Sequence, residues 1–219
     1  MAGLVRVGTR IVKKSSEIYS KDTPFLVTGQ KKYVSRGGEK LEGAVRHFGI
    51  ECRAKTCIDV GCSTGGFTDC LLKEGAEKVY AVDVGYGQIA VELRNDKRVV
   101  LIEKTNARYL QASDFFDKMD LAVIDVSFIS LDKILPAIFP LMQLKGRVLA
   151  LVKPQFEAGR KDVSKGVVKD DTIRLKAVRR ISDVASSLGW SSSNPYCSPL
   201  KGPAGNVEYF IYLQRADGL

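Results

Sequence analysis

A glycine-rich turn directly after an apolar run constrains the fold of this chain more than any other feature. Residues 57–67 read CIDVGCSTGGF, in which the apolar run ends at Asp59, the turn begins at Gly61, and Gly65 and Gly66 precede an amphipathic segment. Glycines at a strand-to-helix junction let the backbone turn sharply and let a ligand approach bare amides. The pattern therefore predicts an α/β fold with a ligand site at this turn.

The spacing of these glycines excludes two phosphate-binding motifs. A phosphate loop ends in Gly-Lys-Ser/Thr, whereas here Gly66 is followed by Phe67. The dinucleotide-binding pattern G-x-G-x-x-G is also absent, because the glycines run G-x-x-x-G-G. The turn thus favours a nucleoside ligand that is not held chiefly through a pyrophosphate. S-adenosylmethionine fits that description.

Apolar runs and helical patterns alternate along the chain after residue 38. Several runs are apolar almost throughout, as expected of parallel strands that are covered by helices on both faces. This alternation predicts a Rossmann-like, doubly wound, mostly parallel α/β sheet. We expect strands near residues 56–60, 78–84, 98–103, 120–126, 146–152 and 206–213, and helices near 38–48, 66–74, 87–94, 130–141 and 170–188.

The beginning of the chain is strongly basic. Six of the nine net positive charges lie in residues 1–40, and Pro24 and Gly29 interrupt the pattern before the α/β alternation starts. We expect residues 1–32 to form a short basic extension and residues 33–219 to form the main domain. Such a segment can neutralise phosphates, although a solvated surface explains the charge equally well. The basic residues are Arg6, Arg10, Lys13, Lys14, Lys21, Lys31, Lys32, Arg36 and Lys40.

Four polar residues follow the predicted strands. Asp83, Asp125 and Lys153 each close an apolar run, and Asn106 comes shortly after another. Ligands of an open parallel sheet bind beyond the carboxyl ends of its strands. An acid about 20 residues after the glycine turn accepts hydrogen bonds from ribose hydroxyls, and an amide can read an adenine edge. Any one of these residues could simply end a strand in a wet turn, but four together indicate a site.

Seven segments in this order carry a family resemblance. They closely resemble the TlyA-type branch of the FtsJ-like RNA 2′-O-methyltransferases, also labelled haemolysins, over about residues 33–213. The segments are YVSRGGEKL (33–41), DVGCSTGGF (59–67), AVDVGYGQ (81–88), EKTNAR (103–108), DVSFISL (125–131), LVKPQFE (151–157) and NVEYF (206–210).

The resemblance implies a seven-stranded methyltransferase sheet, S-adenosylmethionine as methyl donor, and a cytidine ribose of ribosomal RNA as acceptor. It implies a catalytic tetrad of Lys40, Asp125, Lys153 and Glu208. It also implies a set of donor-binding residues, in which Asp83 holds the ribose, Asn106 lies near the adenine, and Asp59 supports the turn or the methionine amino group. The whole donor-binding set is Asp59, Gly61, Ser63, Gly65, Gly66, Asp83 and Asn106.

The chemistry of a ribose hydroxyl is consistent with such a tetrad. A 2′-hydroxyl is a poor nucleophile unless its proton is removed or tightly held. Lys153 is either the base or the group that orients the hydroxyl, with Asp125 and Glu208 holding it. Lys40 would add positive potential near an RNA phosphate or the second carboxylate. The opposing interpretation is that the carboxylates keep Lys153 charged, so that catalysis is mostly alignment.

Two further segments bear on RNA binding. Residues 1–27 resemble only the latter part of an S-four-type RNA-binding module, so we expect a shortened chain in which RNA affinity is affected more than donor binding. Residues 157–169 (EAGRKDVSKGVVK) follow Lys153 and are rich in Arg and Lys. They are either a mobile loop that contacts RNA or an ordinary solvated loop.

Two other functions compete with methyl transfer. The haemolysin label suggests a membrane-active protein, but the sequence has no apolar run of membrane-spanning length and no evident lytic helix. A non-catalytic RNA-binding factor of ribosome assembly would not need two lysines and two carboxylates. The five cysteines form no CxxC pair, which argues against zinc and favours a reducing compartment. We therefore expect a cytoplasmic enzyme without a metal or a membrane partner.

Overall fold

The computed structural model describes residues 5–12, 16–27 and 31–216. The chain divides into two compact units, Met1–Lys32 and Tyr33–Leu219. The first contains a three-stranded antiparallel sheet in the order β2-β1-β3, made of β1 (Val5–Val7), β2 (Arg10–Ile11) and β3 (Phe25–Val27). Of the basic residues in this unit, Lys13 and Lys14 lie outside the described residues.

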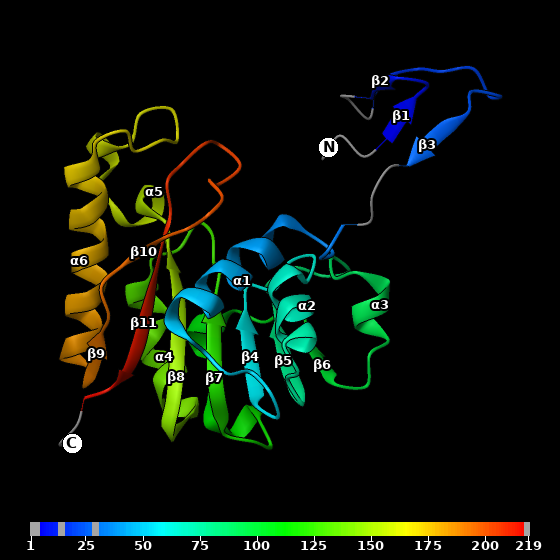
Figure 1. Cartoon of the computed structure of the whole chain (residues 1–219). Coiled ribbons are helices and arrows are strands. Elements are labelled where there is room, and N and C mark those ends of the chain that lie inside the picture. The colour runs from blue at the N-terminus through cyan, green and yellow to red at the C-terminus, as the bar shows by residue number, and fades with distance from the viewer. Residues whose placement is uncertain (1–4, 13–15, 28–30, 217–219) are drawn as a thin grey trace. The chain divides into compact units, whose positions relative to one another are not determined.

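The second unit is built on one large, mostly parallel sheet (Figure 1). Its order is β10-β11-β8-β7-β4-β5-β6, and β9 pairs with β11 as an eighth strand. The strands are β4 (Thr56–Val60), β5 (Lys78–Val82), β6 (Val99–Ile102), β7 (Met119–Ile124), β8 (Met142–Val152), β9 (Trp190–Ser192), β10 (Tyr196–Cys197) and β11 (Tyr209–Arg215). The two short strands β9 and β10 are absent from the sequence-based prediction.

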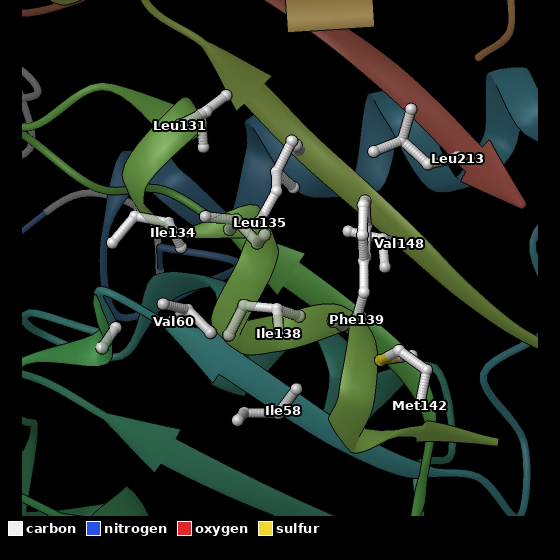
Figure 2. Packing of buried hydrophobic residues seen from close by; sticks show 14 of the residues in the cluster. Ile58, Val60, Leu131, Ile134, Leu135, Ile138, Phe139, Met142, Val148 and Leu213 are labelled. Carbon is white, nitrogen blue, oxygen red and sulfur yellow. The ribbon is translucent and has the colours of Figure 1, made fainter. Parts of the chain in front are cut away.

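Helices cover both faces of this sheet, so the predicted fold class is confirmed. One apolar cluster joins α1 (Arg36–Phe48), α2 (Gly66–Lys73) and α3 (Val91–Arg94) to the sheet. The cluster on the other face joins α4 (Leu135–Ile138) and α6 (Asp171–Ser187) to it. In Figure 2, Leu135 and Ile138 of α4 lie over strand residues such as Ile58 and Val148. A further short helix, α5 (Pro154–Glu157), follows β8 directly.

The predicted helix at 130–141 is wrong as one continuous element. The structure divides it into a 3-10 turn η3 (Leu131–Lys133), α4 and a second 3-10 turn η4 (Phe139–Leu141). Pro136 and Pro140 explain the division, because proline has no N–H to donate to the preceding turn. The predicted helix at 87–94 is likewise reduced to α3, after a turn in which Gly87 has φ +70°.

The strand order places a topological switch point at the centre of the sheet. From β4 the chain runs outward through β5 and β6, and then returns to the other side of β4 with β7 and β8. All of these neighbours are parallel, whereas β11 is antiparallel to β8. The crevice beyond the carboxyl ends of β4 and β7 is where such a sheet binds its ligand. No helix in the described part of the chain is long and apolar enough to cross a membrane.

Candidate functional site

A cavity of about 560 Å³ lies at this crevice, within the roughly 300–1,000 Å³ range of small-ligand pockets. It is formed by the segments that follow β4, β5, β6 and β7. Four of the predicted donor-binding residues and one predicted catalytic residue are part of its lining. The lining residues that matter here are Gly61, Ser63, Asp83, Asn106, Asp125, Ser127 and Phe128.

The three predicted glycines differ in what they do. Gly61 lines the cavity with φ +86°, and a Cβ there would lie 2.6 Å from the backbone oxygen of Asp125. A Cβ on Gly65 would meet Leu93 at 2.3 Å, and one on Gly66 would meet the Ser35 hydroxyl at 2.2 Å. Gly61 therefore allows β4 and β7 to approach each other at the cavity. Gly65 and Gly66, in contrast, allow helices to pack and are not among the lining residues.

Asp83 braces the glycine turn from the end of the neighbouring strand. Its carboxylate accepts hydrogen bonds from the backbone N–H of Ser63 at 2.8 Å and of Gly85 at 2.7 Å. It also lines the cavity, as does Asn106, whose Oδ1 accepts a hydrogen bond from the Arg108 N–H at 3.1 Å. The structure thus brings Asp83 and Asn106 together with the turn, as the strand order requires.

Asp59 lies beneath the turn and is not part of the cavity lining. Its side chain is fully buried, Oδ2 accepts a hydrogen bond from the Thr68 hydroxyl at 2.7 Å, and Oδ1 has no hydrogen-bond partner among the described residues. Burial raises the pKa of this carboxyl to about 7, and Asp125 and Asp83 add to the effect. Asp59 therefore connects strand β4 to helix α2 from inside the protein.

Asp125 and Lys153 meet at the ends of adjacent strands. The Lys153 Nζ lies 2.5 Å from Asp125 Oδ1 and donates a hydrogen bond to the Ser127 hydroxyl at 2.9 Å. Asp125 and Ser127 both line the cavity, so the ammonium group is held at its edge. Ser127 was not among the predicted site residues, although it lies in the segment DVSFISL (125–131) that carries the family resemblance.

Glu208 and Lys40 form the second lysine–carboxylate pair. Their Oε2 and Nζ atoms are 2.6 Å apart and both side chains are almost completely buried. Register pairs Tyr209 with Val152, which brings Glu208 to the end of β8. Its contacts differ from the expected ones, however. Among the described residues it binds Lys40 and the Gln155 amide at 3.3 Å, whereas Lys153 pairs with Asp125 alone.

The basic segment after α5 is attached to the loop that carries Glu208, just before β11. The Asn206 side chain accepts a hydrogen bond from the Val168 N–H at 3.0 Å and donates one to the Gly166 carbonyl at 2.8 Å. Arg160, Lys161 and Lys165 are exposed. Glu157, which we counted with this loop, is instead buried.

Comparisons with known proteins agree with this geometry. FtsJ-like methyltransferases match residues 33–215. The 16S/23S rRNA (cytidine-2′-O)-methyltransferase TlyA of Mycobacterium tuberculosis is 45% identical over 216 residues, which cover 97% of this chain and 81% of that protein. Hemolysin A of Brachyspira hyodysenteriae is 47% identical over 217 residues, with coverage of 97% and 90%.

A solved structure gives the same result for the fold. A protein from Streptococcus thermophilus, which carries a hemolysin name, has a TM-score of 0.87 and 42% identity, over 99% of this chain and 80% of that chain. The family match spans both the cavity and the two lysine–carboxylate pairs. Both the sequence segments and the arrangement they adopt thus lead to one assignment: this chain belongs to the FtsJ-like methyltransferases.

Proposed function

We propose that this protein transfers a methyl group from S-adenosylmethionine to a ribose 2′-hydroxyl of ribosomal RNA, with cytidine as the target nucleoside. The relative from M. tuberculosis is named for this activity. The observation that carries the proposal is that Asp125 and Ser127 line the cavity and also hold the Lys153 ammonium group. A donor pocket and a group able to bind a hydroxyl therefore share one wall.

The cavity suits this donor chemically. S-adenosylmethionine, when bound, supplies an electrophilic methyl group on a positively charged sulfur. Gly61, Ser63, Asp83 and Asn106 line the cavity and would hold the donor, with Asp83 on the ribose and Asn106 near the adenine. Among the described residues, no lysine or arginine lines the cavity, consistent with a ligand that brings its own positive charge. Gly65, Gly66 and Asp59 would act by fixing the shape of the turn.

Lys153 is the group that handles the acceptor hydroxyl. A lysine ammonium has three N–H donors; Lys153 donates one to Ser127 and forms an ion pair with Asp125. Another N–H would bind the 2′-oxygen and align it with the methyl group. Of the two roles that the sequence leaves open for Lys153, this is the orienting one. Asp125 would keep Lys153 charged, and the proton of the 2′-hydroxyl would pass to solvent as the oxygen takes the methyl group from the sulfur.

The second pair supports this arrangement from behind. Glu208 is held by Lys40 and Gln155, and Gln155 lies two residues after Lys153. This pair would fix the backbone that follows β8 and so the direction of Lys153. The exposed Arg160, Lys161 and Lys165 would contact RNA phosphates. A ribosomal substrate would also mean that the enzyme works in the cytoplasm.

A tritiated-methyl transfer assay on unmodified ribosomal subunits, compared with naked ribosomal RNA, tests the proposal. We expect label in RNA at a ribose 2′-oxygen. Absence of label from both substrates, together with leakage from liposomes, would replace methyl transfer with the membrane-active alternative. A pH–rate profile of Lys153→Arg then separates the two roles of Lys153. Arginine keeps N–H groups that can hydrogen-bond the 2′-oxygen, but it cannot act as a base. An orienting role therefore predicts partial activity.

Donor binding is tested separately by titration calorimetry with S-adenosylmethionine. Asp83→Ala removes the ribose acceptor and the brace on the backbone of Ser63 and Gly85, and we expect binding to become undetectable. Lys153→Arg serves as the matched control and should bind the donor normally. Retained micromolar affinity in Asp83→Ala would contradict the assignment of the pocket.

A further inference from the structure

Glu157 is a buried carboxylate that the proposed chemistry does not use. It ends helix α5, four residues after Lys153, and its side chain is only 2% exposed. Oε1 accepts a hydrogen bond from the Leu131 N–H at 2.9 Å, and Oε2 accepts one from the Ser130 hydroxyl at 2.5 Å. A short helix that follows β8 is thereby tied to the segment that follows β7.

Arg180 of α6 completes this contact from a third element. Its Nη2 lies 2.5 Å from Glu157 Oε2 and 2.7 Å from the Ser130 hydroxyl, and its Nη1 donates to Asp132 at 3.0 Å. The Ser130 hydroxyl also accepts from the Asp132 N–H at 3.3 Å. With one hydrogen bond donated and two accepted, this hydroxyl has used its full capacity.

The segment between the two attachments is strained. Residues 125–131 are held at one end by Lys153, through Asp125 and Ser127, and at the other by Glu157. Between them Phe128 has φ +64°, a left-handed conformation that is strained for a residue with a side chain. Such strain persists only where the surroundings hold it. The attachment at Glu157 provides that restraint.

We propose that Glu157 and Arg180 are positioning residues for methyl transfer. They act as a clamp, defined as Glu157, Arg180 and Ser130, that fixes residues 125–131 relative to Lys153. The clamp thereby sets the contacts of the Lys153 Nζ with Asp125 and Ser127. This inference rests on the proposed function in that it gives these contacts a catalytic purpose.

The clamp is tested with Glu157→Gln in the full chain. The amide of glutamine keeps the shape but presents N–H groups to Arg180, which ends the charged contact. We expect kcat for methylation of ribosomal subunits to fall about 10–100-fold, the scale of a misplaced reacting group. KM for the subunits should stay unchanged. The dissociation constant of S-adenosylmethionine should change far less than kcat, because Gly61, Ser63, Asp83 and Asn106 lie outside residues 125–131.

Asp171→Asn is the matched control on the same helix. It also removes one carboxylate from an arginine pair, with Arg174, but Asp171 is exposed and is the first residue of α6, well away from Arg180 along the helix. We expect its kcat to equal that of the unchanged protein. Arg180→Gln is the second clamp variant and replaces Glu157→Gln if that variant does not fold.

A test in the Lys153→Ala background separates positioning from general damage. If the clamp acts through Lys153, Glu157→Gln should lower the residual rate less than threefold there, because the two changes affect one unit. If Glu157→Gln lowers the rate by the same factor with and without Lys153, the two residues act independently and the proposal is overturned.

A crystal structure of Glu157→Gln gives a readout that does not depend on activity. We expect the Lys153 Nζ to lie more than about 4 Å from Asp125, beyond salt-bridge distance. Contacts unchanged from the 2.5 Å of the present structure would overturn the clamp. If the unchanged protein methylates no ribosomal RNA, the proposed function fails, while this structural test still decides whether the clamp positions Lys153.

Discussion

The two lysine–carboxylate pairs of the site have the same chemistry in different surroundings. Lys153 and Asp125 follow neighbouring parallel strands, and their side chains are 11% and 23% exposed. Lys40 and Glu208 are 168 residues apart, and their side chains are 9% and 1% exposed. One pair lies at the edge of a ligand cavity, and the other is enclosed between helix α1 and strand β11.

This difference in surroundings predicts a difference in role. A group that acts on a substrate must be reachable, and only the first pair has a member in the cavity lining. A buried pair has lost its hydration, so that removing one partner leaves a charge without compensation. We therefore propose that Lys153 and Asp125 carry the chemistry and that Lys40 and Glu208 support their geometry.

The largest effect is expected from breaking the pair at the cavity. Lys153→Ala should lower the rate of methyl transfer by about 10²–10³-fold, the loss typical of removing one preorganised hydrogen-bond donor from a site. The partner Asp125 remains close to solvent, so thermal unfolding should change little. Single-turnover transfer and the melting temperature are measured together. A melting temperature far below that of the unchanged protein would mean that Lys153 and Asp125 mainly stabilise the fold.

The next effect is expected from the buried pair and concerns stability. Lys40→Met should lower the free energy of unfolding by about 3–5 kcal/mol, because Glu208 is left buried without a cation. The double variant Lys40→Met/Glu208→Gln should regain much of this loss. Urea denaturation measures both. If the single variant is as stable as the unchanged protein, the two pairs do not differ as their burial suggests.

The same contrast shows what the sequence could reveal. Asp125 and Lys153 are predictable from the alternation alone, because the carboxyl ends of parallel strands meet at one edge. Glu208 precedes a strand that runs antiparallel to β8, and an apolar run does not encode its own direction. Its place in the site, like that of Lys40 on a helix, therefore came only from the family resemblance.

Glycine and proline show a second limit of sequence patterns. The pattern correctly places a turn at 61–66, but it does not say what approaches each glycine. Gly66 faces Ser35, the N-cap residue of helix α1, and not the cavity. The apolar spacing of 130–141 indicated one helix although Pro136 and Pro140 divide it. The contact at Gly66 and the division of this helix both arise where a contact distant in sequence, or a missing N–H, overrides the local pattern.

A smaller effect tests how tightly Glu208 is enclosed. A Cβ on Gly202 would lie 2.5 Å from Glu208 Oε1, so Gly202→Ala should push the carboxylate away from Lys40 and Gln155. We expect a loss of about 1–3 kcal/mol in unfolding free energy, as for other overpacked sites. Gly43→Ala, which meets the movable ring of Pro199 at 2.9 Å, is the comparison. Equal losses in both would mean that the carboxylate is not specifically confined.

The smallest effect concerns Asp59, a buried carboxylate whose partner is the Thr68 hydroxyl, whereas Glu208 is paired with the Lys40 ammonium. Asp59 is as deeply buried as Glu208, and burial raises its pKa from 3.8 to about 7. Between these values the folded state binds the proton and the unfolded state does not, so stability falls as pH rises and levels off above pH 7. From pH 6 to pH 8 this group should lower the free energy of unfolding by about 1 kcal/mol. Asp59→Asn cannot ionise and should show that much less decline in urea denaturation at the two pH values. An equal decline in both proteins would mean that Asp59 is charged in the folded state throughout.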